Sequence, residues 1–161
     1  MVISVKRIWI IAFICVFFDQ LIKDVLLMFM GMGQSIPLIK GFLSITLVSN
    51  TGAAFSMFSS GTIGLIIFSV IALNLIYFLL IKGKNLSKFE MTIYGMLIGG
   101  IIGNLIDRIA YFYVIDYLDF NLFGYNFPVF NLADILIVVS LLLFILREIK
   151  GDIHDVQIRR K

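Results

Sequence analysis

Residues 62–81 read TIGLIIFSVIALNLIYFLLI, a run in which Asn74 is the only strongly polar side chain. A helix of about 20 mostly apolar residues is long enough to cross the hydrocarbon core of a bilayer. The whole chain has the matching composition: 61% of its 161 residues are hydrophobic and 14% are charged, whereas roughly 25% are charged in soluble domains. The sequence therefore predicts an integral membrane protein.

Three further apolar segments lie on either side of this run, at about 8–28, 89–109 and 132–146. We therefore predict an all-α membrane core of four transmembrane helices. Ten of the 13 basic residues precede the first segment, separate the second from the third, or follow the fourth. Because Lys and Arg accumulate on the cytoplasmic side, both termini are expected there. Residues 1–150 would form a single domain, and 151–161 a basic, disordered cytoplasmic tail.

Charge and composition argue against several other classes. The formal net charge is +3, but the basic residues do not form the continuous patch that nucleic acid requires. Cys15 is the only cysteine, so neither a disulfide within the chain nor a cysteine-based metal site is possible. His154, the only histidine, lies in the charged tail. A His-rich metal site or a Ser-His-Asp triad is therefore not expected.

The two outer connections, about 29–61 and 110–131, have sequence patterns of their own. Residues 43–47 alternate apolar and polar side chains, as in a strand with one buried face. Residues 111–130 contain nine aromatic side chains, and aromatic rings favour the membrane–water interface. We therefore predict a small extracytoplasmic β-sheet within residues 35–60 on the membrane surface, with 111–130 folded over it.

The first segment carries charged side chains, which cost about 2.5–3.5 kcal/mol each inside the hydrocarbon core. Asp19 and Lys23 lie one helical turn apart with the acid first, which suits an ion pair. Such a pair either orients the first helix or supports a nearby polar site, and the sequence leaves both interpretations open.

The third segment has two distinct lines of residues. One is a stripe of small residues that lets another helix approach closely: Gly95, Gly99 and Gly103. On the adjacent line Asn104 and Arg108 point in the same direction, and Asp107 lies one turn from Asn104. Three roles stay open for Arg108: contact with lipid phosphate, pairing with Asp107, or holding a substrate carbonyl.

Asp116 and Asp134 form the candidate pair for acid–base chemistry. Asp116 follows the third helix and Asp134 begins the fourth, so antiparallel neighbours bring both to the same membrane face. Two adjacent carboxyl groups share one proton, so that one can act as general base on water while the other acts as acid. The simpler alternatives are a helix N-terminus, with Asn131 as its cap and Asp134 stabilising the dipole, and a solvated loop acid at 116.

Five stretches of the sequence, in this order, resemble the lipoprotein signal peptidases, also called signal peptidase II. They are Asp19-Gln20-x-x-Lys23, Asn50-Thr51-Gly52-Ala53-Ala54-Phe55, Gly103-Asn104-x-x-Asp107-Arg108, Val114-x-Asp116 and Phe130-Asn131-x-Ala133-Asp134. The resemblance covers nearly the whole chain apart from the tail. The sequence departs from the family pattern at Phe112, where glycine is frequent, and at Tyr117, where phenylalanine is usual.

The resemblance implies an aspartyl endopeptidase of the bacterial cytoplasmic membrane. It would hydrolyse the bond before the diacylglyceryl-modified cysteine of a prolipoprotein, at the outer face and without metal or cofactor, and would bind the cyclic peptide inhibitor globomycin. In this family the catalytic pair corresponds to Asp116 and Asp134. Substrate-binding or supporting roles are expected for Asp19, Lys23, Asn50, Gly52, Asn104, Asp107, Arg108, Asn131 and Ala133. We further expect a monomer that contacts membrane lipids.

Two other functions remain open from the residues alone. The charged groups within the membrane could form the proton or ion path of a small translocating subunit: Asp19, Lys23, Asp107 and Asp134. Such a path should continue to the cytoplasmic side, where the second and fourth helices are almost purely apolar. A non-catalytic scaffold held by the glycine stripe would leave the two aspartates without a role beyond capping.

Overall fold

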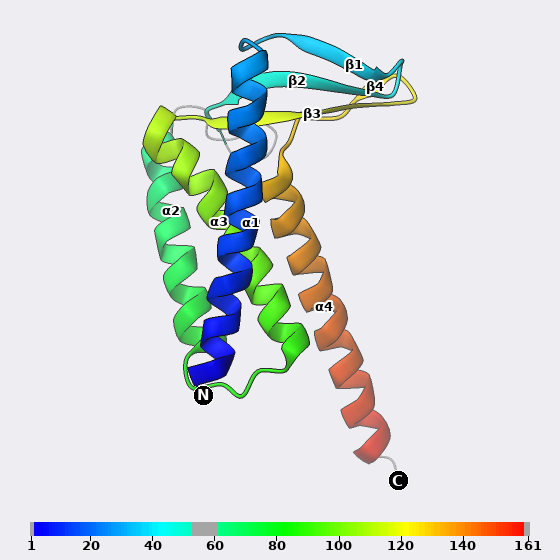
Figure 1. Ribbon diagram of the computed structural model, residues 1–161. Helices are drawn as coiled ribbons and strands as arrows, with labels where there is room; N and C mark the ends of the chain where they lie inside the picture. Colours follow the sequence, from blue (N-terminus) through cyan, green and yellow to red (C-terminus); the bar gives the residue numbers. More distant parts are fainter. Residues whose placement is uncertain (1, 53–60, 160–161) are drawn as a thin grey trace.

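The computed structural model describes the backbone of residues 2–52 and 61–159, and side chains within 5–52 and 61–149. These residues form a bundle of long helices with one sheet at its end (Figure 1). The helices are α1 (Val2–Phe29), α2 (Thr62–Leu75) continued by the π-helix η2 (Ile76–Ile81), α3 (Lys88–Tyr111) and α4 (Leu132–Arg159). The strands, antiparallel in the order β1-β2-β3-β4, are β1 (Ser35–Ile39), β2 (Leu43–Asn50), β3 (Val114–Leu122) and β4 (Tyr125–Asn126). The predicted helical core with a small sheet is confirmed.

Two parts of the prediction are wrong. α4 continues to Arg159 instead of ending near 146 before a disordered tail, because its last part contains no proline and only one glycine, Gly151. One glycine costs about 1 kcal/mol in a helix and does not end it. Residues 111–130 supply β3 and β4 of the same sheet instead of covering it, since their β-branched and aromatic side chains favour strand pairing. Part of the predicted outer segment, 53–60, lies outside the described residues.

The glycine stripe of α3 packs against α1 (Figure 1). A Cβ atom on Gly95 would lie 2.7 Å from an α1 side chain, and one on Gly99 would lie 2.5 Å from the Cβ atom of Cys15. Gly100 faces α4, where the same atom would lie 2.6 Å from the carbonyl oxygen of Ala133. Only glycine permits such short distances, so the predicted close approach of another helix is confirmed.

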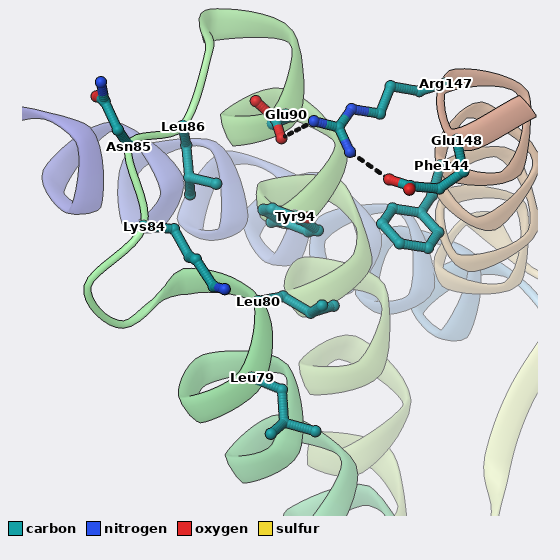
Figure 2. A pocket seen from close by; sticks show the side chains of 10 residues that line it. All are labelled: Leu79, Leu80, Lys84, Asn85, Leu86, Glu90, Tyr94, Phe144, Arg147 and Glu148. Atoms are coloured by element: carbon teal, nitrogen blue, oxygen red, sulfur yellow. Dashed lines mark hydrogen bonds and ion pairs between the residues drawn. The ribbon is translucent and has the colours of Figure 1, made fainter. Parts of the chain in front are cut away.

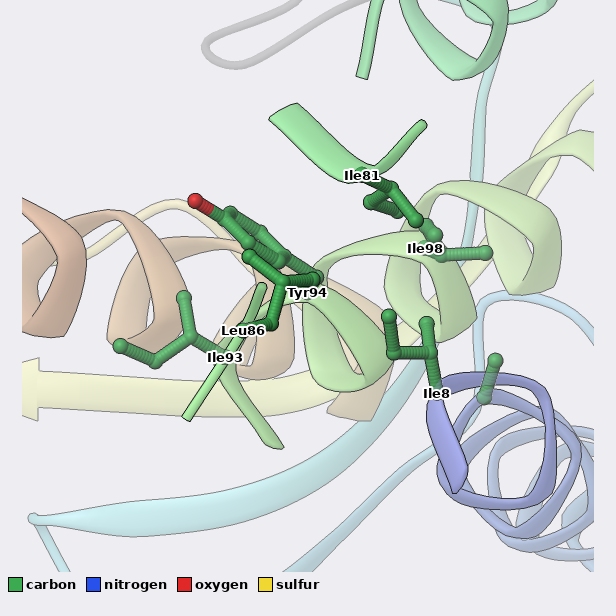
Figure 3. Packing of buried hydrophobic residues seen from close by; sticks show 7 residues of the cluster. Ile8, Ile81, Leu86, Ile93, Tyr94 and Ile98 are labelled. Carbon is green, nitrogen blue, oxygen red and sulfur yellow. The ribbon is translucent and has the colours of Figure 1, made fainter. Parts of the chain in front are cut away.

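At the end of the bundle away from the sheet, apolar side chains form a buried cluster (Figure 3). The labelled members are Ile8, Ile81, Leu86, Ile93, Tyr94 and Ile98. Beside it lies a cavity of about 390 Å³ lined by η2, α3 and α4 (Figure 2). Glu90 and Arg147 pair in its wall, with 2.7 Å between Oε1 and Nη2. This end is therefore held mainly by apolar packing, with its charges near the surface.

Apolar side chains also cover the outside of the bundle. Large apolar residues that are more than half exposed include Phe13, Phe68, Leu79, Ile109 and Leu142. In the part of the chain that the structure describes, two segments are long and apolar enough to cross a bilayer, Thr62–Ile81 and Lys88–Tyr111. α1 and α4 contain more charged residues but expose similar apolar faces. Such a surface suits contact with lipid better than contact with water.

Near Thr46 and Leu118 the sheet has an apolar row of side chains on one face and polar side chains on the other, since cross-strand partners share a face. Ile36, Ile45 and Leu118 lie opposite one another on β1, β2 and β3, and their row is apolar. On the polar side Thr46 Oγ1 donates a hydrogen bond of 2.7 Å to Oδ2 of Asp119. This part of the sheet is therefore amphipathic, which suits a layer between an apolar and an aqueous phase.

Candidate active site

The sheet meets the bundle where β3 follows α3 and where α4 begins. A cavity of about 760 Å³ opens at this junction, and Asp116 of β3 and Asp134 of α4 both line it. Three other residues that the sequence singled out, Asn50, Asn104 and Arg108, line the same cavity. The fold therefore brings the two aspartates to one site, as their positions at the ends of antiparallel helices predict. We call Asp116 and Asp134 the acidic pair.

Asp116 is held by neutral amides from two directions. Asn50, the last residue of β2, donates from Nδ2 to Oδ2 at 2.8 Å, and Asn131 donates from Nδ2 to Oδ1 at 2.7 Å. The residue is only 2% exposed. Burial, followed by the nearby carboxyl of Asp134, raises the pKa of Asp116 to about 7. The burial of Asp116 and its two amide partners exclude a fully solvated loop acid.

Asp134 lies in the first turn of α4 and is bonded to amides as well. Its Oδ1 accepts from Nδ2 of Asn104 at 2.8 Å, and its Oδ2 accepts from the backbone N–H of Asn131 at 3.2 Å. In return, Oδ1 of Asn131 accepts from the backbone N–H of Asp134 at 3.0 Å. This reciprocal pair is a helix capping box. The predicted capping role is thus confirmed, and it coexists with a place in the cavity wall.

Arg108 reaches from α3 to the segment that follows β2. Its Nη2 donates to the carbonyl oxygen of Gly52 at 3.2 Å, and its Nη1 lies 3.4 Å from the carbonyl oxygen of Asn104. Gly52 is fixed in turn by its N–H, which donates to Oδ1 of Asn50 at 2.9 Å. Nε of Arg108 is buried without a hydrogen-bond partner among the described residues. The predicted alternative of an Arg108–Asp107 pair is wrong, because Asp107 binds Lys23 instead.

A second buried charge cluster lies next to the acidic pair. Lys23 Nζ is 2.8 Å from Oδ2 of Asp19 and 2.8 Å from Oδ2 of Asp107. All three residues are at most 1% exposed. We call Asp19, Lys23 and Asp107 the Lys23 clamp. The predicted Asp19–Lys23 pair is confirmed, and Asp107 joins it from α3.

The Lys23 clamp also binds the backbone beside each member of the acidic pair. Asp19 Oδ1 accepts from the N–H of Ala133, at 3.0 Å, and Asp107 Oδ2 accepts from the N–H of Ile115, at 3.1 Å. Ala133 directly precedes Asp134, and Ile115 directly precedes Asp116. The clamp therefore connects α1, α3, β3 and α4, and it sets where both carboxyl groups lie. Of the two interpretations of the Asp19–Lys23 pair, support for a polar site is the one that the contacts favour.

Two residues with roles at the site were not predicted as candidates. Gln20 donates from Nε2 to Oδ2 of Asp19 at 3.1 Å and to Oδ1 of Asp107 at 3.0 Å. Its signals in the sequence are an amide within an apolar helix and its place in the stretch Asp19-Gln20-x-x-Lys23. The hydroxyl oxygen of Tyr117 accepts from the N–H of Leu132 at 3.2 Å, which satisfies a free donor at the start of α4. Phenylalanine, the usual residue at position 117, lacks this hydroxyl group, so Tyr117 adds a hydrogen bond at the start of α4.

The fold and this site together define a helical protein suited to a membrane, with a buried acidic site at one end of the bundle. Within the described residues, no group of three or more His, Cys, Asp or Glu side chains is arranged to hold a metal ion.

Comparisons with known proteins identify the family. The model of the family described as signal peptidase (SPase) II matches residues 11–150. The lipoprotein signal peptidase of Trichormus variabilis is 39% identical over 142 residues, covering 88% of this chain and 89% of the relative. That of Staphylococcus aureus is 36% identical over 140 residues, covering 87% and 86%. A bacterial membrane enzyme solved by the in meso method at 2.3 Å superimposes with a TM-score of 0.83, at 33% identity, covering 94% of this chain and 90% of that one.

The chain therefore belongs to the signal peptidase II family. Members of this family remove signal peptides from prolipoproteins, so the chain is a peptidase of bacterial membranes. The alternative of an ion-translocating subunit is not favoured.

Proposed function

We propose that the chain is an aspartic peptidase and that Asp116 and Asp134 are its catalytic residues. The observation that carries this proposal is the electrostatic setting of the acidic pair. Two buried carboxyl groups line one cavity, and their direct hydrogen-bond partners among the described residues are neutral amide groups. Without a cation in direct contact, such a pair retains a proton near neutral pH. A shared proton is what amide hydrolysis by two carboxyl groups requires.

The reaction follows from this shared proton. The ionised carboxylate takes a proton from a water molecule, whose oxygen attacks the carbonyl carbon of the peptide bond. The protonated partner donates its proton to the carbonyl oxygen as the tetrahedral intermediate forms. The C–N bond then breaks as the proton taken from water passes to the leaving nitrogen, and the carboxylate that had donated its proton takes one back from a hydroxyl group of the intermediate. The titration belongs to the acidic pair as a unit, because the two groups interact strongly.

Asn131 and Asn104 orient the acidic pair for this reaction. Asn131 is hydrogen-bonded to both carboxyl groups, through Nδ2 to Asp116 and through its backbone N–H to Asp134. Its Nδ2 also donates to Oδ1 of Asn104 at 3.0 Å. Donors fixed in this way need no rearrangement when charge moves between the two aspartates, which lowers the barrier.

The cavity walls suit a lipid-modified substrate. Val138 and Ile135 on α4 line the cavity, and Val138 is 54% exposed toward the outside of the bundle. We infer that the diacylglyceryl chains of the substrate cysteine lie along this apolar wall while the preceding peptide bond enters between β3 and α4. Arg108 also lines the cavity, so its guanidinium group is suited to bind a substrate carbonyl oxygen, and Gly52 lies beside it. Globomycin would occupy the same cavity.

For the topology we propose four membrane-spanning helices, with both termini in the cytoplasm and the acidic pair at the outer face. The support is the charge distribution: Lys82, Lys84 and Lys88 lie at the connection between η2 and α3, at the end of the bundle opposite the sheet (Figure 1), and Arg147 pairs with Glu90 at the same end. Basic residues at that end favour a cytoplasmic location. Residues 1–150 would act as one peptidase domain and as a monomer among membrane lipids, with 151–161 as a basic extension.

The proposal is tested with Asp116→Asn and Asp134→Asn in detergent, on a lipidated peptide with a lipobox cysteine. Each should lower kcat by about 10²- to 10⁴-fold, the usual contribution of a general acid or base. Asp119→Asn is the matched control, since Asp119 lies on the same strand but binds Thr46 on the polar face of the sheet. It should cleave normally. A folded variant of either catalytic residue with full activity would show that the assignment is wrong.

Globomycin binding is tested separately by thermal shift. A ligand that binds only the folded state raises the midpoint of unfolding, so wild type should melt at a higher temperature with saturating globomycin. Arg108→Ala removes a side chain from the cavity wall and should reduce the shift. An unchanged midpoint for wild type would contradict the proposed inhibitor site without affecting the assignment of the acidic pair.

A further inference from the structure

Phe112 and Phe123 have left-handed backbone conformations at the two ends of β3. Phe112 is the C-cap of α3, with φ of 63°. Phe123 has φ of 54° and is the first residue of the two-residue turn closed by the Leu122–Tyr125 pair. Glycine and asparagine are favoured at both kinds of position, because a side chain in this conformation strains the backbone. Phenylalanine at both ends of one strand therefore strains the backbone, and some other interaction of the ring should offset this strain.

The two rings are largely exposed and form no aromatic pair with another described side chain. Phe112 is 62% exposed and Phe123 is 108% exposed. Aromatic ring contacts join several other residues of this region, among them Phe42 with Phe120 and Tyr111 with Tyr113, but include neither ring among the described side chains. Within the described residues, no aromatic partner offsets the strained backbone at either ring.

The positions of the rings point to lipid. Phe112 continues the lipid-facing surface of α3, next to Ile109 and Tyr111, which are 60% and 42% exposed. Phe123 is at the tip of the part of the sheet that extends past α4 (Figure 1). Leu122 and Tyr125, also exposed, flank it. Since a strand rises about 3.3 Å per residue, β3 separates the two rings by about 30 Å.

We propose that Phe112 and Phe123 insert into the interface of the outer leaflet and fix the tilt and depth of β3 in the membrane. Aromatic rings favour this layer, and lipid would remove from water the apolar surface that the protein leaves uncovered. Asp116 lies on β3 between them, so both rings together set the height of this carboxyl group relative to the lipid head groups. The importance of that height for cleavage rests on the proposed function, whereas the insertion itself does not.

Insertion is measured by the fluorescence of a single tryptophan. In a Trp9→Phe background, the variants Phe112→Trp, Phe123→Trp and Ser35→Trp each carry one reporter. Ser35 is the matched control, because it is exposed and lies with Thr46 on the polar face of the sheet. In vesicles of phosphatidylcholine and phosphatidylglycerol, lipids brominated on the upper acyl chain should quench the reporters at 112 and 123, and aqueous iodide should quench the reporter at 35. Quenching at 123 by iodide alone would overturn the proposal, and protection from both quenchers would indicate a protein partner instead.

The functional consequence is measured with Phe123→Asn. Asparagine followed by Gly124 is a preferred pair for this turn, so the variant removes the ring while relieving the backbone. Its midpoint of thermal unfolding in detergent should rise by a few degrees. Cleavage of a lipidated peptide should fall several-fold in vesicles and stay near the wild-type rate in detergent micelles, which adapt to the protein. Equal effects in both media would overturn the role of the ring. Because quenching needs no catalysis, failure of the proposed function would leave the depth measurement intact.

Discussion

The Lys23 clamp and the acidic pair are neighbouring sites that bury two carboxyl groups each in different ways. In the clamp an ammonium group lies 2.8 Å from both aspartates. In the acidic pair the direct contacts come from Asn50, Asn104 and Asn131. An ion pair compensates the desolvation of buried charge, whereas neutral amides leave part of it uncompensated. The clamp is therefore suited to stability and the acidic pair to proton transfer.

The two sites are also mechanically connected. The clamp holds the backbone N–H of Ala133 and of Ile115, the residues directly before Asp134 and Asp116. A cluster with a cation between its carboxyl groups thus positions one whose direct partners are neutral amides. The comparison predicts that mutations in the clamp act first on folding, while mutations in the acidic pair act on catalysis and on the pH dependence of stability.

The largest expected effect on stability is that of Lys23→Met. It removes the cation and leaves Asp19 and Asp107 buried without their partner, which costs about 3–5 kcal/mol when a buried pair is broken. The unfolding midpoint in detergent should drop strongly. The control is the triple variant Asp19→Asn/Lys23→Met/Asp107→Asn, which removes all three charges and should recover much of the loss. A single variant that melts like wild type would contradict the role of the clamp.

Asp116→Asn should change how stability depends on pH. The folded-state pKa of Asp116 is about 7, above the value of about 3.9 for a free aspartate. The folded state therefore keeps a proton that the unfolded state has lost, and this contribution to stability decreases as pH rises from about 4 to 7. The asparagine variant does not titrate, so its stability relative to wild type should grow by roughly 2–3 kcal/mol from pH 5 to pH 8, at about 1.4 kcal/mol per unit. If the free energies of unfolding of wild type and Asp116→Asn changed with pH in the same way, the raised pKa of buried Asp116 would be contradicted.

Local signals allowed much of the fold and of the two sites to be predicted from the sequence. The spacing of Asp19 and Lys23, the glycine stripe and the Asn131 cap depend on contacts within one helix or on one helix face, and helical periodicity fixes these. Contacts between segments far apart in the sequence were harder to predict. That Asp107 faces Lys23, while its neighbour Arg108 faces the cavity, depends on how α3 is rotated in the bundle. The aromatic residues in 111–130 indicated a location at the membrane–water interface. The pairing of this segment with β2 depends on strand register, which composition does not specify.

Gly103→Ala should have an intermediate effect and tests the space around the clamp. A Cβ atom at this position would lie 2.6 Å from Oδ2 of Asp19 and 3.3 Å from Cβ of Ala133. Such overpacking typically costs about 1–3 kcal/mol, and displacement of Asp19 would also lower activity. Gly64→Ala is the matched control, because nothing lies within 4 Å of its added atom. It should stabilise α2 by about 0.5–1 kcal/mol. If the two substitutions changed the free energy of unfolding equally, Asp19 in the Lys23 clamp could shift to make room for the added atom without cost.

The smallest expected effect is that of Glu90→Gln at the opposite end of the bundle. Glu90 pairs with Arg147 at 2.7 Å, a distance like those in the Lys23 clamp, but Arg147 is 43% exposed. Water already solvates this pair, so its removal should cost no more than about 1 kcal/mol and less at high salt. Glutamine keeps the capping box with Ser87, so the substitution isolates the ion pair. If unfolding in detergent showed that Glu90→Gln costs as much as Lys23→Met, burial could not be what distinguishes the clamp, and the contrast between a structural and a reactive charge cluster would need another cause.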